Sequence, residues 1–260
     1  MTFEQAVLLS AIAGATIFLG LPIGRLRNLS TRTQALLTTG AAGVILFLVW
    51  DILTAAVEPV EASLEAATSG DGPTGDFVVN LLAFALSIGF GLLSLVWFAS
   101  RVRRRRAEGL STHDIAMGTA IGLGLHNLSE GLAIGQSAAI GETAFALILV
   151  IGFALHNATE GFGIAAPLTS GPRPSWSFLA LLGLIGGGPT FVGGVIGYSF
   201  VSPLLSIVFL GLAAGALIYV FNEMMATSRK FAQPVASNVA LLIGLLVAFG
   251  TDFFLVAVGA

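Results

Sequence analysis

The sequence predicts an all-α integral membrane protein with eight transmembrane helices and both termini outside the cytoplasm. Three observations support this fold class. First, 56% of the 260 residues are hydrophobic and only 10% are charged, whereas a soluble domain has about a quarter of its residues charged. Second, eight apolar segments have the length needed to cross a bilayer. Third, the basic residues are confined to the loops on one side of that eight-helix arrangement.

The eight apolar segments account for most of the chain. A helix that crosses a hydrocarbon core of about 30 Å needs roughly 20 largely apolar residues. Between the fourth and fifth segments only Gly141-Glu142 intervenes, which predicts a tight hairpin between antiparallel helices. We therefore expect residues 1–260 to form a single polytopic transmembrane domain. The segments are 6–24, 33–57, 77–100, 113–139, 143–168, 176–200, 202–227 and 236–258.

The charges of the connecting loops predict the topology. The basic residues all fall after the first, third, fifth and seventh segments, and the side that carries them is the cytoplasmic side by the positive-inside rule. We therefore expect 58–76, with five acidic residues, to be an acidic extracytoplasmic loop, and 101–112 to be a basic cytoplasmic loop. The basic residues are Arg25, Arg27, Arg32, Arg101, Arg103, Arg104, Arg105, Arg106, Arg173, Arg229 and Lys230.

Two matching motifs carry the chemistry of the sequence. They are His126-Asn127-Leu128-Ser129-Glu130-Gly131 in the fourth segment and His156-Asn157-Ala158-Thr159-Glu160-Gly161 in the fifth. In each motif, His and Glu are four residues apart and therefore project from one face of a helix. Imidazole nitrogen and carboxylate oxygen together suit Zn²⁺ and neighbouring first-row divalent ions. Asn127 and Asn157 add amide groups for a second ion or for orienting water.

Both motifs are expected in the middle third of the bilayer. At 1.5 Å per residue, His126 and His156 each lie about 20 Å from the start of their antiparallel helices. Ionisable groups at that depth are costly and usually face a cavity or a partner. One His–Glu pair could serve only as a hydrogen-bonded packing contact, but hydrogen bonding alone does not require the pattern twice. The sequence therefore predicts one metal site formed by His126, Glu130, His156 and Glu160.

The eight segments, with HNLSEG in the fourth and HNATEG in the fifth, resemble the ZIP (Zrt/Irt-like) metal-transporter family. Its motifs read approximately HNxPEG in the fourth helix and H or Q, then N, D or E, then xPEG in the fifth. The resemblance implies a 3+2+3 fold, in which helices one to three and six to eight form an inverted repeat around the central metal site. It also implies a homodimer that moves Zn²⁺, or Fe²⁺, Mn²⁺ or Cd²⁺, toward the cytoplasm across the cell membrane.

Three acidic residues outside the motifs are candidates for the transport pathway. Asp51 and Asp252 lie in the outer parts of the second and eighth segments, where they would form an entrance that concentrates cations. Glu223, near the cytoplasmic end of the seventh segment, resembles a family glutamate at the inner exit. The alternative for each is a residue at a helix end that reaches the membrane interface.

The chain departs from the family pattern at three positions. Ser129 and Thr159 replace the motif prolines, and proline would have freed a backbone carbonyl in each helix. Gly188, before Pro189, stands where many bacterial relatives carry a glutamate that completes a two-metal site. This last difference favours one bound ion over two, or an altered metal selectivity.

Two other functions fit part of the pattern. An intramembrane metal-dependent hydrolase would also bury His and carboxylate ligands, but the chain has no H-E-x-x-H pair and no separate general base once both glutamates bind metal. A metal-gated channel or sensor is the second alternative. We expect no enzyme activity, no cofactor and no nucleic-acid partner, since the net charge is only −3. The expected partners are divalent metal ions and the lipid bilayer.

Overall fold

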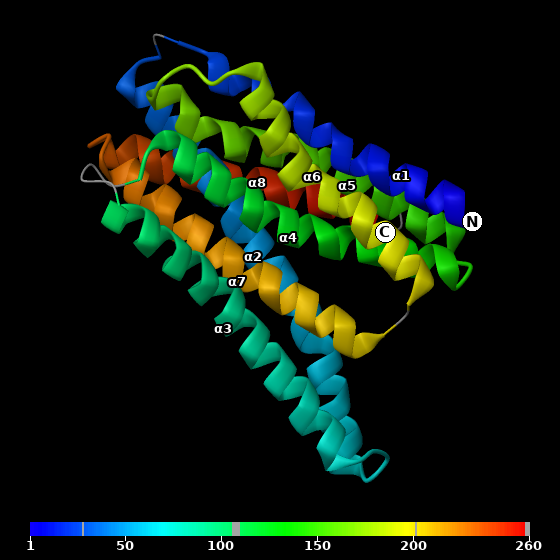
Figure 1. Ribbon diagram of the computed structural model, residues 1–260. Coiled ribbons are helices and arrows are strands. Elements are labelled where there is room, and N and C mark those ends of the chain that lie inside the picture. Colours follow the sequence, from blue (N-terminus) through cyan, green and yellow to red (C-terminus); the bar gives the residue numbers. More distant parts are fainter. Residues whose placement is uncertain (28, 106–109, 201, 258–260) are drawn as a thin grey trace.

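The computed structural model shows a helical bundle (Figure 1). It describes the chain except for residues 28, 106–109, 201 and 258–260, and the side chains of 102–105, 148, 156, 159 and 254–256 also lie outside the described part. No strand occurs among the described residues. The α-helices are α1 (Phe3–Ala15), α2 (Thr31–Ser69), α3 (Thr74–Arg105), α4 (Thr112–Ala139), α5 (Thr143–Ala165), α6 (Trp176–Ser199), α7 (Pro203–Arg229) and α8 (Pro234–Ala257). Three short 3₁₀ helices are η1 (Thr16–Leu19), η2 (Leu21–Arg25) and η3 (Ala166–Ser170).

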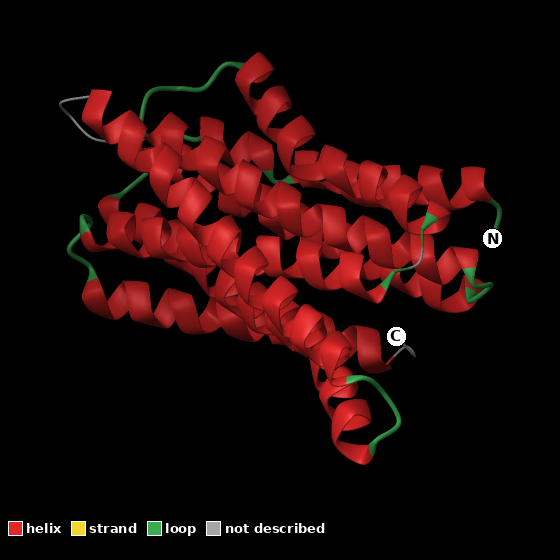
Figure 2. Ribbon diagram, turned by 60° about the horizontal axis from the view of Figure 1, so that its bottom comes forward, coloured by secondary structure: helices red, strands yellow, loops and turns green. Residues whose placement is uncertain are grey.

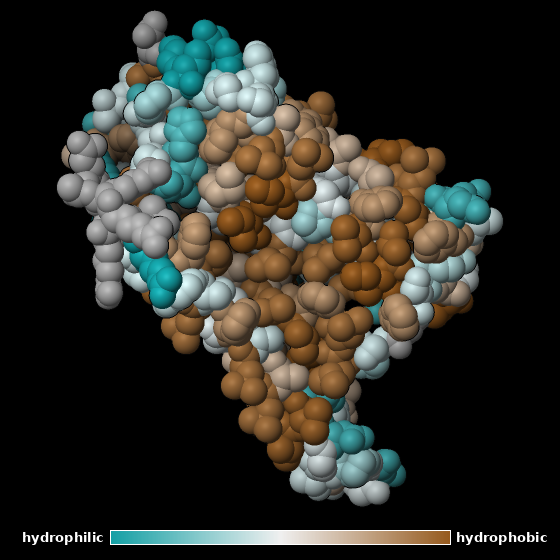
Figure 3. Space-filling model, viewed as in Figure 1, coloured by the Kyte–Doolittle hydropathy of each residue, from teal (hydrophilic) through white to brown (hydrophobic). Residues whose placement is uncertain are grey.

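The surface of the bundle is suited to a bilayer. Within the described residues, seven helical segments are long and apolar enough to cross a membrane, and α4 is not among them. α4 is long enough but carries the polar residues of the first motif, and it packs against α1, α5, α6 and α7 in the centre of the bundle. Its polar groups therefore face protein instead of lipid. The face seen in Figure 3 is mostly hydrophobic across its middle and hydrophilic toward its ends.

The first predicted helix, 6–24, is not one continuous α-helix. α1 ends at Ala15 and the chain continues through η1 and η2 to Arg25. The Thr16 hydroxyl donates hydrogen bonds to the carbonyls of Ala13 and Ala154, which links this break to α5. Gly20 approaches the backbone of α5 at Gly161 so closely that a Cβ at position 20 would overlap it. The tight contact with α5 explains why the backbone changes its winding here.

The segment 58–76, predicted as a loop, is mostly helical. α2 continues to Ser69 and α3 begins at Thr74, so only a short turn around Gly70, with its φ of 84°, separates them. Alanine and glutamate dominate 61–67, and both are strong helix formers, which the prediction underweighted. With 39 residues, α2 is about 58 Å long. The hairpin of α2 and α3 therefore projects beyond the other helices (Figure 1 and Figure 2).

The basic segment 101–112 also contains more helix than predicted. α3 continues to Arg105, and α4 begins at Thr112 with Ser111 as its cap, where the Ser111 hydroxyl accepts a hydrogen bond from the Asp114 amide at 3.2 Å. Residues 106–109, including Arg106, lie outside the described residues. The remaining predicted helix boundaries agree with the structure to within three residues, apart from the last turn of the fifth segment, which is η3.

Helices from the first part of the chain pack against helices from the last part. α1 packs against α6, α2 against α7 and α8, and α3 against α7. The N-terminus and the last turn of α8 lie at the same end of the bundle, together with the α4–α5 turn (Figure 1). We refer to this end as the terminal end. The opposite end carries basic residues at the end of η2 (Arg25), just before α6 (Arg173) and at the end of α7 (Arg229). We call it the basic end.

Candidate metal centre

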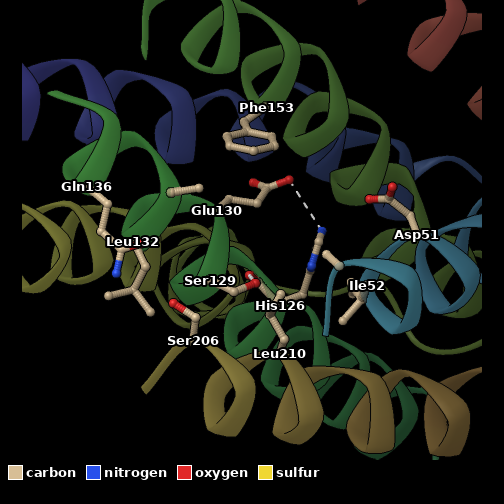
Figure 4. Close-up of a pocket in the computed structure, with 12 residues that line it drawn as sticks. Asp51, Ile52, His126, Ser129, Glu130, Leu132, Gln136, Phe153, Ser206 and Leu210 are labelled. Carbon is tan, nitrogen blue, oxygen red and sulfur yellow. Dashed lines mark hydrogen bonds and ion pairs between the residues drawn. The ribbon is translucent and has the colours of Figure 1, made fainter. Parts of the chain in front are cut away.

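Side chains from α4 and α5 converge in the centre of the bundle. His126 Nε2 lies 3.3 Å from Glu130 Oε1, one helical turn along α4, and 3.6 Å from Glu160 Oε1 on α5. All three side chains are buried, and one ligand atom from each lies within 4.8 Å of the others. Figure 4 shows the imidazole of His126 directed at the carboxylate of Glu130. The i,i+4 spacing on α4 is what brings these two groups together.

The two separations that involve His126 match those of ligands around one ion. Zn²⁺ binds histidine nitrogen and carboxylate oxygen at about 2.1 Å, so two such ligands in tetrahedral geometry are about 3.4 Å apart. Both ring nitrogens of His126 and Oε1 of Glu160 are buried without a hydrogen-bond partner in the described part of the chain. Buried polar atoms normally have a partner. A divalent cation would provide one for His126 Nε2 and for the carboxylate oxygen at once.

Two asparagines connect the motifs across the interface between α4 and α5. Asn127 Nδ2 donates to Glu160 Oε2 at 2.9 Å, and Asn157 Nδ2 donates to Glu130 Oε2 at 3.0 Å. Asn127 Nδ2 also donates to Asn157 Oδ1. Each asparagine thus holds the carboxylate of the other motif and leaves Oε1 of that carboxylate directed at His126. In this arrangement the amides orient ligands, and Asn127 Oδ1, buried without a hydrogen-bond partner, is the amide oxygen available to an ion.

Ser129, which stands at the position of the family's first motif proline, is hydrogen-bonded to the backbone of its own helix. Ser129 Oγ donates to the carbonyl of His126 at 2.6 Å, within the same turn of α4. Such hydroxyl-to-backbone bonds compete with the helical pattern and bend helices modestly. α4 is fixed to α6 by a further bond, in which Asn127 Nδ2 donates to the carbonyl of Gly186 at 3.0 Å. The side chain of Thr159, at the equivalent position of the second motif, lies outside the described residues.

A cavity of about 270 Å³ adjoins the cluster and is partly polar. Asp51 contributes a carboxylate from α2, close enough to His126 and Asp252 to interact with both electrostatically. Gln136, near the end of α4, and Ser206, in the first turn of α7, lie on its side toward the terminal end. The cavity is lined by Asp51, Ile52, Ala55, His126, Ser129, Glu130, Leu132, Ala133, Gln136, Phe153, Ser206 and Leu210 (Figure 4).

The predicted residues do not all meet in this cavity. His156 belongs to α5, one turn before Glu160, but its side chain lies outside the described residues. Asp252 lies on α8 and is near Asp51, although it does not line the cavity. Glu223 lines a separate cavity of about 210 Å³ between α3 and α7, together with Tyr219 and Asn222. The structure therefore groups Asp51 with the candidate metal cluster of His126, Glu130 and Glu160, and separates Glu223 from it.

Position 188 faces away from the cluster. Gly188 falls on the stripe of α6 that carries the exposed side chains Leu184 and Phe191, and a Cβ there would meet no atom within 4 Å. The part of α6 that reaches the cluster is the Gly186 carbonyl.

Sequence reasoning did not identify Gln136 and Ser206 as cavity residues. Gln136 offered a signal, since an amide inside a membrane segment usually faces a cavity or a partner. Ser206 offered none, because serine is common near helix ends and its hydroxyl can bond to its own helix, as it does here to the carbonyl of Ser202.

The sequence was also compared with known proteins. The family model of the ZIP zinc transporters matches residues 99–252, which is more than half of the chain. The chain belongs to this family. The matched region includes both motifs and extends from the end of α3 into α8. No curated protein matches the sequence. Membership in the ZIP family confirms the resemblance inferred from the two motifs and implies transport of divalent metal ions through a multi-pass membrane protein.

Proposed function

We propose that this ZIP protein carries Zn²⁺ toward the cytoplasm through a site formed by His126, Glu130, His156 and Glu160, with Fe²⁺, Mn²⁺ and Cd²⁺ as the other candidate ions. One observation carries the proposal. Nε2 of His126 lies 3.3 Å from a Glu130 oxygen and 3.6 Å from a Glu160 oxygen, and the three ligand atoms are buried within 4.8 Å of one another. His156 is included because it repeats the position of His126 in the second motif.

The cavity gives the proposed site an opening on one side of the bundle. It leads from His126 and Glu130 past Gln136 and Ser206 toward the terminal end, the end expected outside the cytoplasm. Asp51 adds negative charge to this path and would raise the local concentration of cations. We interpret the cavity as the outer entrance, with release at the basic end after the site becomes exposed there. Net flux then requires that the ligands bind tightly enough to replace hydration water and weakly enough to release the ion.

The packing supports the proposed inverted repeat. In such a repeat, α1, α2 and α3 correspond to α6, α7 and α8 in that order. The contact between α3 and α7 then corresponds to the contact between α8 and α2, and both contacts are present. The pairs α1 with α6, α2 with α7, and α4 with α5 each correspond to themselves, and all three are in contact as well. The reciprocal bonds of Asn127 to Glu160 and of Asn157 to Glu130 follow the same two-fold relation. Inverted repeats around a midplane site are a recurrent transporter design.

The expected homodimer and the cell membrane as location remain part of the proposal. The outer face of α3 carries large exposed apolar side chains, among them Leu86, Phe90 and Trp97. Lipid or a second copy of the chain would cover such a face.

The test of the proposal is uptake of ⁶⁵Zn²⁺ into proteoliposomes that contain the full chain. We expect saturable uptake by the native protein and its loss in His126→Ala and in Glu160→Gln. Two controls change the same residue types elsewhere. They are His113→Ala, where the native ring lies 4.7 Å from that of Phe178 at a tilt of 39°, and Glu142→Gln at the exposed α4–α5 turn. Unlabelled Fe²⁺, Mn²⁺ and Cd²⁺, added as competitors, would rank the ions.

Each outcome of this experiment bears on a different part of the proposal. Undiminished uptake by His126→Ala and Glu160→Gln would show that ions do not pass through this site. Metal binding without uptake would favour the sensor or hydrolase alternatives, and uptake that disappears without a membrane potential would favour a channel. A different ion that competes better than unlabelled Zn²⁺ would replace Zn²⁺ as the proposed substrate.

A further inference from the structure

Three arginines gather at the basic end of the bundle, where η2, η3 and the start of α6 meet. Arg25 ends η2, Arg27 follows two residues later, and Arg173 lies just before α6. Arg27 and Arg173 are both close enough to Arg25 to interact with its charge. Between described residues, no ion pair joins a carboxylate to these arginines. The cluster therefore carries three positive charges without a counter-ion from the described part of the protein.

Contacts with the protein fix the orientation of two of these guanidinium groups. Arg25 Nη1 donates to the carbonyl of Pro174, and its guanidinium carbon lies 4.4 Å from the centre of the Trp176 ring. Arg27 Nη1 donates to the carbonyl of Leu26 at 2.7 Å and, more weakly, to that of Leu168 at 3.4 Å. Because these bonds already order the long side chains, the side chains lose less conformational entropy when a ligand binds.

Two of the remaining donors are buried without an acceptor. Arg25 Nε and Arg27 Nη2 have no hydrogen-bond partner in the described part of the chain. A buried, charged donor that lacks an acceptor is costly. Phosphate oxygens suit these donors because guanidinium presents a planar fork of N–H groups that matches phosphate geometry.

The surroundings of the cluster are those of a membrane interface. Trp176, on which Arg25 stacks, is 61% exposed at the start of α6, and tryptophan is enriched at the headgroup level of bilayers. Further along α6, exposed Leu181 and Leu184 would continue into the hydrocarbon region. An ion bound by the arginines would therefore lie at the depth of lipid phosphates.

We propose that Arg25, Arg27 and Arg173 form a binding site for a phosphate group, supplied by the headgroup of an anionic lipid or by free phosphate. The site joins η2 to η3 and to the start of α6, and it lies away from the metal cluster. It is independent of the identity of the transported ion.

Native mass spectrometry of the full chain in a neutral detergent tests this site, with phosphatidylglycerol as the added lipid. We expect Arg25→Gln/Arg27→Gln to bind this lipid about tenfold more weakly than the native chain, as the loss of charge-assisted hydrogen bonds predicts. The control Arg32→Gln/Arg229→Gln removes two exposed charges from the same end of the bundle and should retain native affinity. Arg173→Gln provides a second test that leaves the bonds to Pro174 and Leu26 intact, and it should also weaken binding.

The outcomes separate the two sources of phosphate from each other and from failure of the proposal. Displacement of the lipid by millimolar inorganic phosphate would identify free phosphate as a ligand, and its retention would identify the lipid headgroup. If Arg25→Gln/Arg27→Gln and the control Arg32→Gln/Arg229→Gln lose lipid affinity equally, only the total charge matters. That result would overturn the proposal. Native affinity in Arg173→Gln together with native affinity in Arg25→Gln/Arg27→Gln would overturn it as well. If the double variant does not fold, native affinity in Arg173→Gln alone would overturn it.

Discussion

Asn127 on α4 donates a hydrogen bond to Glu160 on α5 at 2.9 Å, across the interface between the two motif helices. The bond occupies Oε2 of the carboxylate and leaves Oε1, 3.6 Å from His126 Nε2, for an ion. Asn157 makes the corresponding bond to Glu130 in the opposite direction. The two asparagines therefore fix the orientation of the carboxylates, as outer hydrogen-bond partners fix the orientation of ligands in metal sites.

Replacing either asparagine should weaken metal binding without removing a charged ligand. We expect Asn127→Ala to lower Zn²⁺ affinity by about 10- to 100-fold, because loss of an orienting partner has effects of that size in metal sites. Asn157→Ala should have a similar effect because of the reciprocal geometry. Isothermal titration calorimetry of the purified protein would measure both, with the exposed Asn238→Ala on α8 as the control. Unchanged affinity in both variants would show that the carboxylates orient themselves.

Asp51 should influence how external ions reach the site more than how they cross it. Its carboxylate lines the cavity next to His126, so Asp51→Asn removes negative charge from the proposed entrance. We expect the apparent KM for Zn²⁺ uptake to rise several-fold at low ionic strength, and less at high salt, because salt screens the field of such groups. Glu61→Gln, an exposed acid on the projecting part of the same helix, is the control. An effect of Asp51→Asn that does not depend on salt would argue for direct coordination.

Gly131 should tolerate no side chain, because α4 and α6 approach each other there. A Cβ at Gly131 would overlap the carbonyl of Thr190, a backbone atom that cannot rotate away. We expect Gly131→Ala to destabilise the protein by about 1–3 kcal/mol, the usual cost of overpacking. Gly118→Ala, on the same helix, should be tolerated, since its nearest neighbour would be Tyr219 Cε1 at 3.8 Å. Thermal stability measured by size-exclusion chromatography after heating would compare the two, and equal stability would mean that α4 and α6 can separate.

The positions of most helices and the convergence of the motifs could be predicted because both depend on local pattern. The lengths of the apolar segments predict the membrane-spanning helices. The four-residue spacing of His126 and Glu130 predicts that both project from one face of α4. The helical extension of α2 differs from the prediction because acidic residues in 58–76 indicate only that the segment lies in water. A charged segment in water can still be helical. The bonds made by Asn127 and Asn157 depend on how α4 and α5 are rotated against each other, which no single segment specifies.

Gly188→Glu should not create a second metal site in this protein. Family resemblance places Gly188 where other members carry a site glutamate, but the structure puts it on the exposed stripe of α6 with Leu184 and Phe191. A carboxylate there would point away from His126 and would face the surroundings of the bundle. We expect the variant to bind the same number of Zn²⁺ ions per chain as the native protein, measured by elemental analysis after equilibrium dialysis. An additional bound ion that is lost again in Gly188→Gln would mean that α6 turns toward the cluster when metal binds.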